Sequence, residues 1–159
     1  MNATDDPLAQ REPELAGQTV VVIGGSAGIG LETARRARAE GAKVTITGRS
    51  PGRLAQAAED VGAESTAAFD ATDAAALARF FENVPAPIDH VMTTASGPTY
   101  GPLLEMDSAQ VQVGLSDHVV LDLEIARNAA GKMRPGGTLV FMGGTGGRRV
   151  GHEIGRAHV

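Results

Sequence analysis

Three glycines near the N-terminus are spaced so that they could bind a phosphate group. Gly24, Gly28 and Gly30 follow an apolar, β-branched run, residues 20–23, and precede a segment with the composition of a helix, residues 31–40. Glycines let the backbone approach a phosphate closely, and the free N–H groups and the dipole of a helix N-terminus favour negative charge. The order strand, glycine turn, helix therefore predicts a dinucleotide site. In it Gly24 makes the turn, Gly28 admits the pyrophosphate and Gly30 lets the helix pack on the strand. The alternative is a glycine-rich turn that binds no ligand.

The residues after the second predicted strand favour one dinucleotide over another. That strand, residues 43–47, is followed by Gly48, Arg49 and Ser50, with Arg53 one turn further on. Sites for NAD(H) usually place Asp or Glu here to hold the free ribose hydroxyls. A guanidinium instead forks onto a phosphate, so Arg49 predicts a 2′-phosphate and NADP(H) preferred over NAD(H). The alternative is that Arg49 is a solvated loop charge, because exposed arginines are common.

Two further groups follow the third and fourth predicted strands. Asp70 could accept a hydrogen bond from an adenine amino group, or it could cap the next turn through its own backbone, and the sequence favours neither role. Thr94, Ala95 and Ser96 are small residues at the end of a strand, and they leave room for a ligand at the crevice of a sheet. They are equally compatible with a tight loop.

An alternation of strands and helices would position these residues. Strands are predicted at residues 19–23, 43–47, 64–69, 88–93 and 138–142, and helices at 28–40, 51–61, 74–83 and 108–133. Asp73 is expected to cap the third helix, and a turn is expected at residues 135–137. This alternation predicts an α/β fold with a parallel sheet, helices on both faces and right-handed crossovers. The strands are nearly continuous apolar runs, as a sheet buried on both faces requires.

Composition narrows the class of protein. The chain has 159 residues, enough for one domain, and 42% hydrophobic residues with only 3% aromatics predict an aliphatic core. There is no cysteine, which excludes disulfides and thiolate metal sites, and no metal is expected. A net charge of −5 gives no basic surface for nucleic acid, and no apolar run approaches membrane length. Without a signal-peptide pattern, a cytoplasmic protein is expected.

In order and spacing, these features resemble the short-chain dehydrogenase/reductase family. The resemblance rests on residues 23–30, on Gly48 with Arg49, on Asp70, on residues 88–90 leading into 94–96, and on residues 136–142. It implies a Rossmann-like doubly wound parallel sheet of about five strands, a nicotinamide cofactor and hydride transfer. The expected organisation is a flexible lead (1–16), a Rossmann-like dinucleotide-binding domain (17–149) and a disordered tail (150–159). The residues expected to bind the cofactor are Gly24, Ser26, Gly28, Ile29, Gly30, Arg49, Ser50, Asp70, Thr94, Ala95 and Ser96.

The residues that carry the family's proton chemistry are missing from this chain. The family uses a Ser after the fifth strand and a Tyr-x-x-x-Lys motif, in which the Lys lowers the pKa of the Tyr so that it can act as general acid/base. The only tyrosine, Tyr100, is followed four residues later by Leu104, and at the Ser position only Thr145 carries a hydroxyl. The family's helix Asn aligns near Asp117 and His118, where His118 could relay protons or be an ordinary helix residue. We therefore expect a C-terminally shortened member that binds NADP(H) but is catalytically incomplete, with catalytic residues unknown.

The helix predicted over residues 108–133 indicates a protein partner. Its apolar residues are Val111, Val113, Leu115, Val119, Val120, Leu121, Leu123 and Ile125. They cover more than one stripe, and exposed patches of this kind usually bind a partner. In the family this helix packs against another subunit, so a homo-oligomer is expected. Two other interpretations stay open: a non-catalytic nucleotide-binding or assembly module on the same fold, and, more distantly, a methyltransferase, which would usually have an acidic residue where this chain has Arg49.

Overall fold

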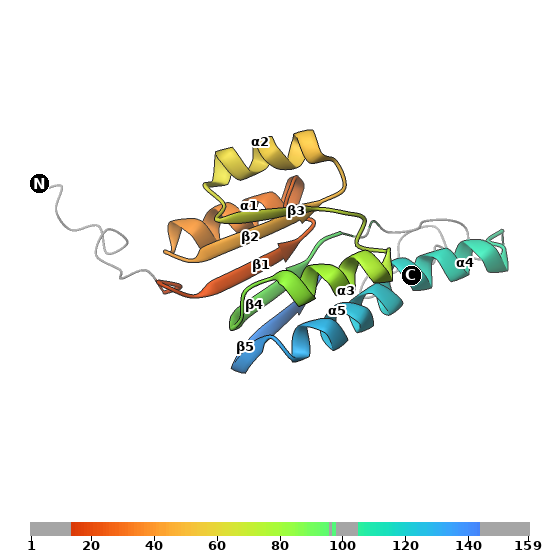
Figure 1. Ribbon diagram of the computed structural model, residues 1–159. Helices are drawn as coiled ribbons and strands as arrows, with labels where there is room; N and C mark the ends of the chain where they lie inside the picture. The colour runs from red at the N-terminus through yellow and green to blue at the C-terminus, as the bar shows by residue number, and fades with distance from the viewer. Residues whose placement is uncertain (1–13, 96, 98–104, 144–159) are drawn as a thin grey trace, which may run out of the picture.

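The structure is a computed structural model that describes residues 14–95, 97 and 105–143. Five parallel strands form one sheet in the order β3-β2-β1-β4-β5, with helices on both faces (Figure 1). The predicted α/β, doubly wound architecture is therefore confirmed. In chain order the elements are β1 Thr19–Ile23, α1 Gly28–Ala39, β2 Lys43–Gly48, α2 Pro51–Val61, β3 Ser65–Ala68, α3 Ala74–Asn83, β4 Ile88–Thr93, α4 Ser108–Leu115, η1 Ser116–Val120, α5 Leu121–Ala130 and β5 Met133–Phe141.

The two faces of the sheet bury different apolar side chains. On the side of α1 and α2, a first core contains Val22 of β1, Ile46 of β2 and Leu54 of α2. On the side of α3 and α5, a second core contains Val21 of β1 and Phe81 of α3. Successive strand residues point to opposite faces, which is why the neighbours Val21 and Val22 belong to different cores. Burial on both faces explains the apolar, β-branched runs of β1 and β2, whereas the edge strands β3 and β5 are largely exposed.

Local signals set most element boundaries. The predicted cap of α3 is confirmed, because the Asp73 carboxylate accepts hydrogen bonds from the backbone N–H groups of Ala75 and Ala76, each at 3.0 Å. Pro51 stands in the first turn of α2, and Gly62 ends that helix with a φ of +69°, which glycine adopts readily. The bounds predicted for β1, α2, α3 and β4 are confirmed, whereas those of α1, β2 and β3 differ by a residue at one or both ends.

The helix predicted over residues 108–133 is divided and shorter. It forms α4, a π-helical turn η1 and α5, and the chain has already entered β5 at Met133. A π-helical turn contains an additional residue, which rotates everything after it by about 100° around the helix axis. The prediction of one regular helix is therefore wrong.

Strand β5 begins five residues before the predicted start, and the turn expected at residues 135–137 lies inside it. Ile88 of β4 pairs with Met133, but His90 pairs with Thr138, so residues 134–137 bulge opposite Asp89. A turn ahead of the strand is therefore wrong: Met133 already pairs with β4, and the extra residues loop out of the ladder.

A buried carboxylate joins the strands around this bulge. Asp89 Oδ2 accepts a hydrogen bond from the backbone N–H of Thr19 at 2.8 Å, and Oδ1 lies 2.5 Å from Arg134 Nε. The Asp89 side chain is 4% exposed, whereas that of Arg134 is 49% exposed. This contact links the start of β1 to β4 and to the bulge of β5, at the end of the sheet where β1 begins.

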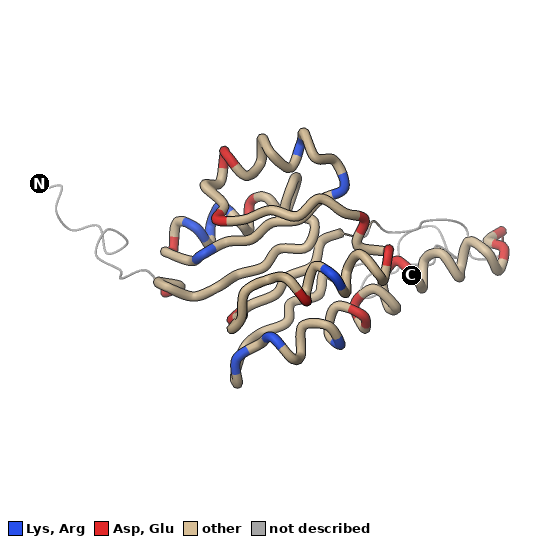
Figure 2. Tube along the Cα trace, viewed as in Figure 1, with Lys and Arg blue, Asp and Glu red and all other residues tan. Residues whose placement is uncertain are grey.

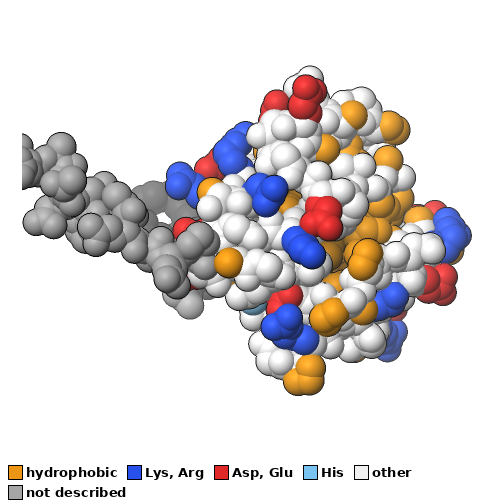
Figure 3. Space-filling model, turned by 60° about the vertical axis from the view of Figure 1, so that its left-hand side comes forward, with side chains coloured by type: hydrophobic (Ala, Val, Ile, Leu, Met, Phe, Trp, Pro, Cys, Tyr) orange, Lys and Arg blue, Asp and Glu red, His pale blue; other side chains and the backbone are white. Residues whose placement is uncertain are grey.

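Large apolar side chains remain exposed on the helical segment that follows residue 107, at the end of β5 and at the residue after it. They are Val113, Leu115, Val119, Val120, Leu123, Val140, Phe141 and Met142. Helix α4 has no charged residue along its length, and it extends past the body of the sheet (Figure 2). Figure 3 shows another face of the molecule, on which hydrophobic side chains form a band flanked by charged ones.

Candidate dinucleotide-binding site

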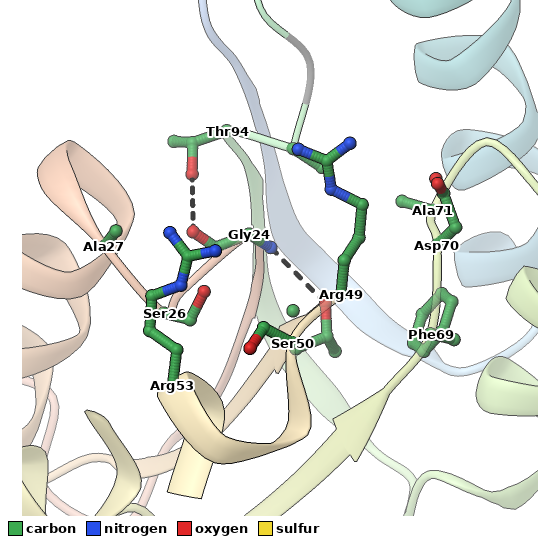
Figure 4. Close-up of a pocket in the computed structure, with 13 residues that line it drawn as sticks. Gly24, Ser26, Ala27, Arg49, Ser50, Arg53, Phe69, Asp70, Ala71 and Thr94 are labelled. Atoms are coloured by element: carbon green, nitrogen blue, oxygen red, sulfur yellow. Dashed lines mark hydrogen bonds between the residues drawn. The ribbon is translucent and has the colours of Figure 1, made fainter. Parts of the chain in front are cut away.

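A hollow of about 180 Å³ lies where the carboxyl ends of β1, β2, β3 and β4 meet (Figure 4). Strand β1 lies between β2 and β4, so the order of the strands reverses at this point, which is where open α/β sheets bind ligands. The predicted site residues that line the hollow are Gly24, Ser26, Arg49, Ser50, Asp70, Thr94 and Ala95. Gly28, Ile29 and Gly30 do not line it, and Ser96 lies outside the described residues.

The turn after β1 is packed too closely for side chains. A Cβ on Gly24 would lie 2.8 Å from the backbone nitrogen of Ala95, and its φ of +92° also favours glycine. A Cβ on Gly30 would overlap the carbonyl oxygen of Gly24 and the Thr94 hydroxyl. That hydroxyl donates a hydrogen bond to the same carbonyl at 3.1 Å, which joins the ends of β1 and β4. Glycine at both positions thus lets the turn, α1 and β4 come into contact.

Gly28 lies beside open space, in contrast to Gly24 and Gly30. A Cβ built on it would meet no atom within 4 Å, and its φ is +54°. It begins α1, and the N-cap residue Ala27 gives no side-chain hydrogen bond to the helix. The N–H groups of the first turn therefore have no capping side chain, and this positive end of the helix can receive an anion. Ile29, in the same turn, is 59% exposed.

Thr47, at the end of β2, holds the glycine turn in place. Its hydroxyl accepts a hydrogen bond from the backbone N–H of Gly24 at 3.3 Å, and its carbonyl accepts one from Gly25 at 2.9 Å. Thr47 is 2% exposed and lines the hollow. Thr47 is not among the residues predicted from the sequence, because the pattern of a strand does not show which group a threonine hydroxyl meets on the neighbouring strand.

Asp70 makes a local turn in this structure. Its Oδ1 accepts hydrogen bonds from the backbone N–H of Thr72 at 3.0 Å and from the Thr72 hydroxyl at 2.8 Å. These hydrogen bonds, and to a smaller extent the positive charge of Arg49, lower the pKa of the Asp70 carboxyl. Of the two roles open from the sequence, the structure shows the turn, and the adenine contact stays a prediction. Phe69 and Ala71, on either side of it, also line the hollow and were not predicted.

None of the described candidates for proton chemistry lines the hollow. Tyr100 and Thr145 lie outside the described residues. Asp117 and His118 lie half-buried in η1 and do not line the hollow. Burial raises the pKa of Asp122, one turn after His118, and the nearby charge of His118 opposes that shift.

The described part of the chain offers neither a metal site nor a membrane-spanning helix. It contains no group of three or more His, Asp or Glu side chains that could hold a metal ion. None of its helices has both the length and the apolar character needed to cross a bilayer.

The cytoplasmic location stays a prediction, as does the division into lead, domain and tail. Leu15, within the predicted lead, packs against the first core and donates its backbone N–H to the Glu40 carbonyl at 3.1 Å.

Curated relatives match most of this chain but only part of their own length. The oxidoreductase asL5 of Sarocladium schorii is 31% identical over 139 residues, which is 84% of this chain and 56% of the relative. The short-chain dehydrogenase/reductase ATR9 of Stachybotrys chlorohalonatus is 27% identical over 132 residues, or 74% of this chain and 51% of the relative. The chain therefore spans about half the length of these two relatives.

Solved structures have the same arrangement of elements. The crystal structure of BdcA in complex with NADPH superposes with a TM-score of 0.76 and 26% identity, covering 89% of this chain and 57% of that one. A double mutant of a Serratia marcescens short-chain dehydrogenase/reductase gives a TM-score of 0.78 and 29% identity, covering 86% and 59%. The family model described as short chain dehydrogenase matches residues 18–153. The chain belongs to the short-chain dehydrogenase/reductase family.

Proposed function

We propose that this chain forms the cofactor-binding part of a short-chain dehydrogenase/reductase-type oxidoreductase and that it prefers NADP(H) to NAD(H). The observation that carries the proposal is the position of Arg49, which follows β2 and lines the same hollow as the glycine turn. A guanidinium there suits a 2′-phosphate and cannot accept hydrogen bonds from ribose hydroxyls. The NADPH bound in the related BdcA structure supports the same cofactor class.

The residues around the hollow fit such a cofactor. The open space beside Gly28, at the uncapped start of α1, suits the pyrophosphate, and Ile29 presents its N–H in the same turn. Ser50 adds a hydroxyl beside Arg49. The side chains of Thr94 and Ala95, and of Ser96 by prediction, are small, so the end of β4 leaves room for the nicotinamide half of the cofactor. When bound, the cofactor supplies the hydride chemistry, while these residues bind and orient it.

We propose that the chain is catalytically incomplete. Hydride transfer to a carbonyl needs a proton donor whose pKa is tuned to the working pH. Four residues after Tyr100 the sequence has Leu104 rather than lysine, and Thr145 is the only hydroxyl at the family's Ser position. These absences favour cofactor binding over turnover by this chain.

Substitution of Arg49 tests the cofactor preference. In Arg49→Ala we expect NADPH to bind about tenfold to a hundredfold more weakly, because a charged hydrogen-bonding group is lost. NADH should bind within about twofold of its affinity for the unmodified chain, since it carries no 2′-phosphate. Isothermal titration calorimetry with both cofactors measures this. Arg36→Ala is the matched control, because Arg36 pairs with Glu32 on α1 at 3.1 Å and does not line the hollow. Tighter binding of NADH than of NADPH by the unmodified chain would overturn the proposal.

A second candidate function, an oligomeric assembly module, is favoured by the apolar helical segment. Val113 is 54% exposed and Val119 is 60% exposed, and both lie in the segment formed by α4, η1 and α5. We propose that this segment is the interface of a homo-oligomer, because exposed apolar patches usually bind a partner. Light scattering on the 16.3 kDa chain should give a mass at least twice that of the monomer, and Val119→Asp should lower it. A monomer at high concentration would count against this interface.

A further inference from the structure

A groove of about 500 Å³ lies between β3 and α3, away from the glycine turn. It is larger than the hollow at the carboxyl ends of the strands, and its volume falls within the range of about 300–1,000 Å³ that is usual for small-molecule sites. β3 is an edge strand of the sheet, and Figure 1 shows it at the front with α3 below it. This β3–α3 groove is lined by Thr45 of β2, by residues 65–69, by one side of α3, and by Val84 and Pro85.

Small side chains on the sheet leave the β3–α3 groove unfilled. Val44 and Ile46 of β2 belong to the first core, so Thr45, which lies between them, points to the face of the sheet that α3 covers. Ser65 pairs with Thr45 in the ladder, and Ala67, two residues later, lies on the same face of β3. No side chain of this row is large enough to reach α3, and an open space remains over the edge of the sheet.

An apolar wall of the groove comes from α3. The helix packs on the sheet through Leu77 and Phe81, which are 0% and 2% exposed in the second core. Ala76 and Phe80 are four residues apart, so they form a neighbouring stripe of the helix, and both line the groove. The ring of Phe80 lies 5.3 Å from that of Phe69, measured between centroids. The two rings give the groove an apolar surface that a ligand could contact.

A hydroxyl pair on the floor of the groove leaves one hydrogen without an acceptor. Thr45 Oγ1 and Ser65 Oγ lie 2.7 Å apart, and Thr45 is 6% exposed. One hydroxyl donates to the other, and neither makes a further hydrogen bond with a described residue. The accepting hydroxyl therefore keeps its own hydrogen, and the groove offers a donor to a ligand.

Arg79 gives the groove a positive charge. Among the described residues it is the one charged side chain that lines the groove, and its guanidinium makes no ion pair or hydrogen bond with any of them. The chain has 19 acidic and 14 basic residues, so the charge of the groove is opposite to that of the whole protein. A guanidinium binds a carboxylate through two parallel hydrogen bonds. Charge complementarity therefore favours an anionic ligand with an apolar body.

We propose that the β3–α3 groove is a second binding site of this chain and that it takes an amphipathic carboxylate such as a medium-chain fatty acid. Arg79 binds the carboxylate, and the apolar wall with Phe69 and Phe80 contacts the chain of methylene groups. The site is separate from the dinucleotide hollow and goes beyond the proposed function, because its charge comes from α3 and not from the residues after β2.

Calorimetry on the full chain with three probes tests the ligand class. Decanoate should bind with one molecule per chain. Hexanoate should bind at least about tenfold more weakly, because it buries four fewer methylene groups. Decylamine, which has the same chain length but a positive charge at pH 7, should also bind at least about tenfold more weakly, since Arg79 repels it. Equal binding of decanoate and decylamine, or no binding of decanoate, would overturn the proposal.

Variants of α3 test the location of the site. Arg79→Ala should weaken decanoate by roughly tenfold, and Arg79→Lys should keep part of the affinity, because lysine retains the charge but not the two parallel hydrogen bonds. Ala76→Leu should also weaken decanoate by roughly tenfold, since the larger side chain fills the groove. Its matched control is Ala75→Leu, an exposed position on the same helix that does not line the groove and should stay within about twofold. Thermal unfolding of each variant checks that the fold is intact.

The other places where decanoate could bind give different results. If Arg49→Ala weakens decanoate as much as Arg79→Ala does, the probe occupies the dinucleotide hollow or responds to charge in general, and the inference is wrong. If Val119→Asp weakens it and Ala76→Leu does not, the probe binds to the exposed helical segment, and the inference is wrong as well. A chain that does not prefer NADPH to NADH would contradict the proposed function and leave this inference standing.

Discussion

Replacement of Gly30 by alanine is expected to lower the free energy of unfolding by about 3 kcal/mol and to abolish NADPH binding. The added Cβ would overlap the Gly24 carbonyl oxygen and the Thr94 hydroxyl, where these two groups already form a hydrogen bond. The carbonyl belongs to the backbone of the turn and cannot rotate away. To make room, α1 must move off the sheet, which moves the helix N-terminus that is proposed to hold the pyrophosphate.

Urea unfolding and calorimetry with NADPH measure the two effects on the same preparation. The matched control is Gly52→Ala in α2, because a Cβ at that position would meet no atom within 4 Å. Alanine is the better helix former, so Gly52→Ala should raise stability by up to about 1 kcal/mol. A Gly30→Ala variant as stable as the unmodified chain would show that α1 does not pack on the turn as described.

Replacement of Asp89 by alanine is expected to lower the free energy of unfolding by about 3 kcal/mol without changing cofactor affinity. The substitution removes a buried carboxylate that accepts from the Thr19 backbone and pairs with Arg134, and it leaves both donors without their acceptor. This contact lies where β1 begins, whereas the hollow lies at the carboxyl ends of the strands. Asp89→Ala should therefore lower the free energy of unfolding and leave the affinity for NADPH unchanged, whereas Gly30→Ala should lower both.

Chemical denaturation of Asp89→Ala should be compared with that of Glu124→Ala. Glu124 pairs with Arg127 on the surface of α5, where the side chains are 29% and 65% exposed, so its loss should cost under about 1 kcal/mol. Asp89→Asn should fall between the two, since an amide oxygen still accepts from Thr19 but forms no ion pair with Arg134. Equal destabilisation by Asp89→Ala and Glu124→Ala would contradict the role given to Asp89.

Elements defined by local signals could be predicted from the sequence. β1 is an apolar, β-branched run that leads into glycines, α2 starts at a proline and is ended by a glycine, and α3 starts after the cap Asp73. Each signal acts over a few residues, so one sequence is enough to recognise it. The residues around the hollow follow from the same logic, because parallel strands bring their carboxyl ends together.

The features that the sequence did not predict depend on contacts between distant residues. The bulge in β5 arises because Met133 and Thr138 both pair with β4, near Asp89, about 45 residues earlier in the chain. The π-helical turn at Ser116–Val120 has no characteristic residue pattern, so the spacing of apolar residues in the sequence does not reveal it. Thr47 belongs to the site because its hydroxyl meets Gly24 across the sheet, and a threonine in a strand has no pattern that shows this partner.

The two cores differ in how much of the chain each needs. The members of the first core and the partly buried residues packed against it all come from residues 15–63, in the order β1, α1, β2 and α2. The second core combines Val21 with residues as distant as Ala129 and Leu139. Local contacts cost little loop-closure entropy and form quickly, whereas distant ones form slowly. During synthesis the first core has all its residues before α3 has been made, so the half of the sheet that carries Arg49 and the glycine turn can take shape while the rest of the chain is still being translated.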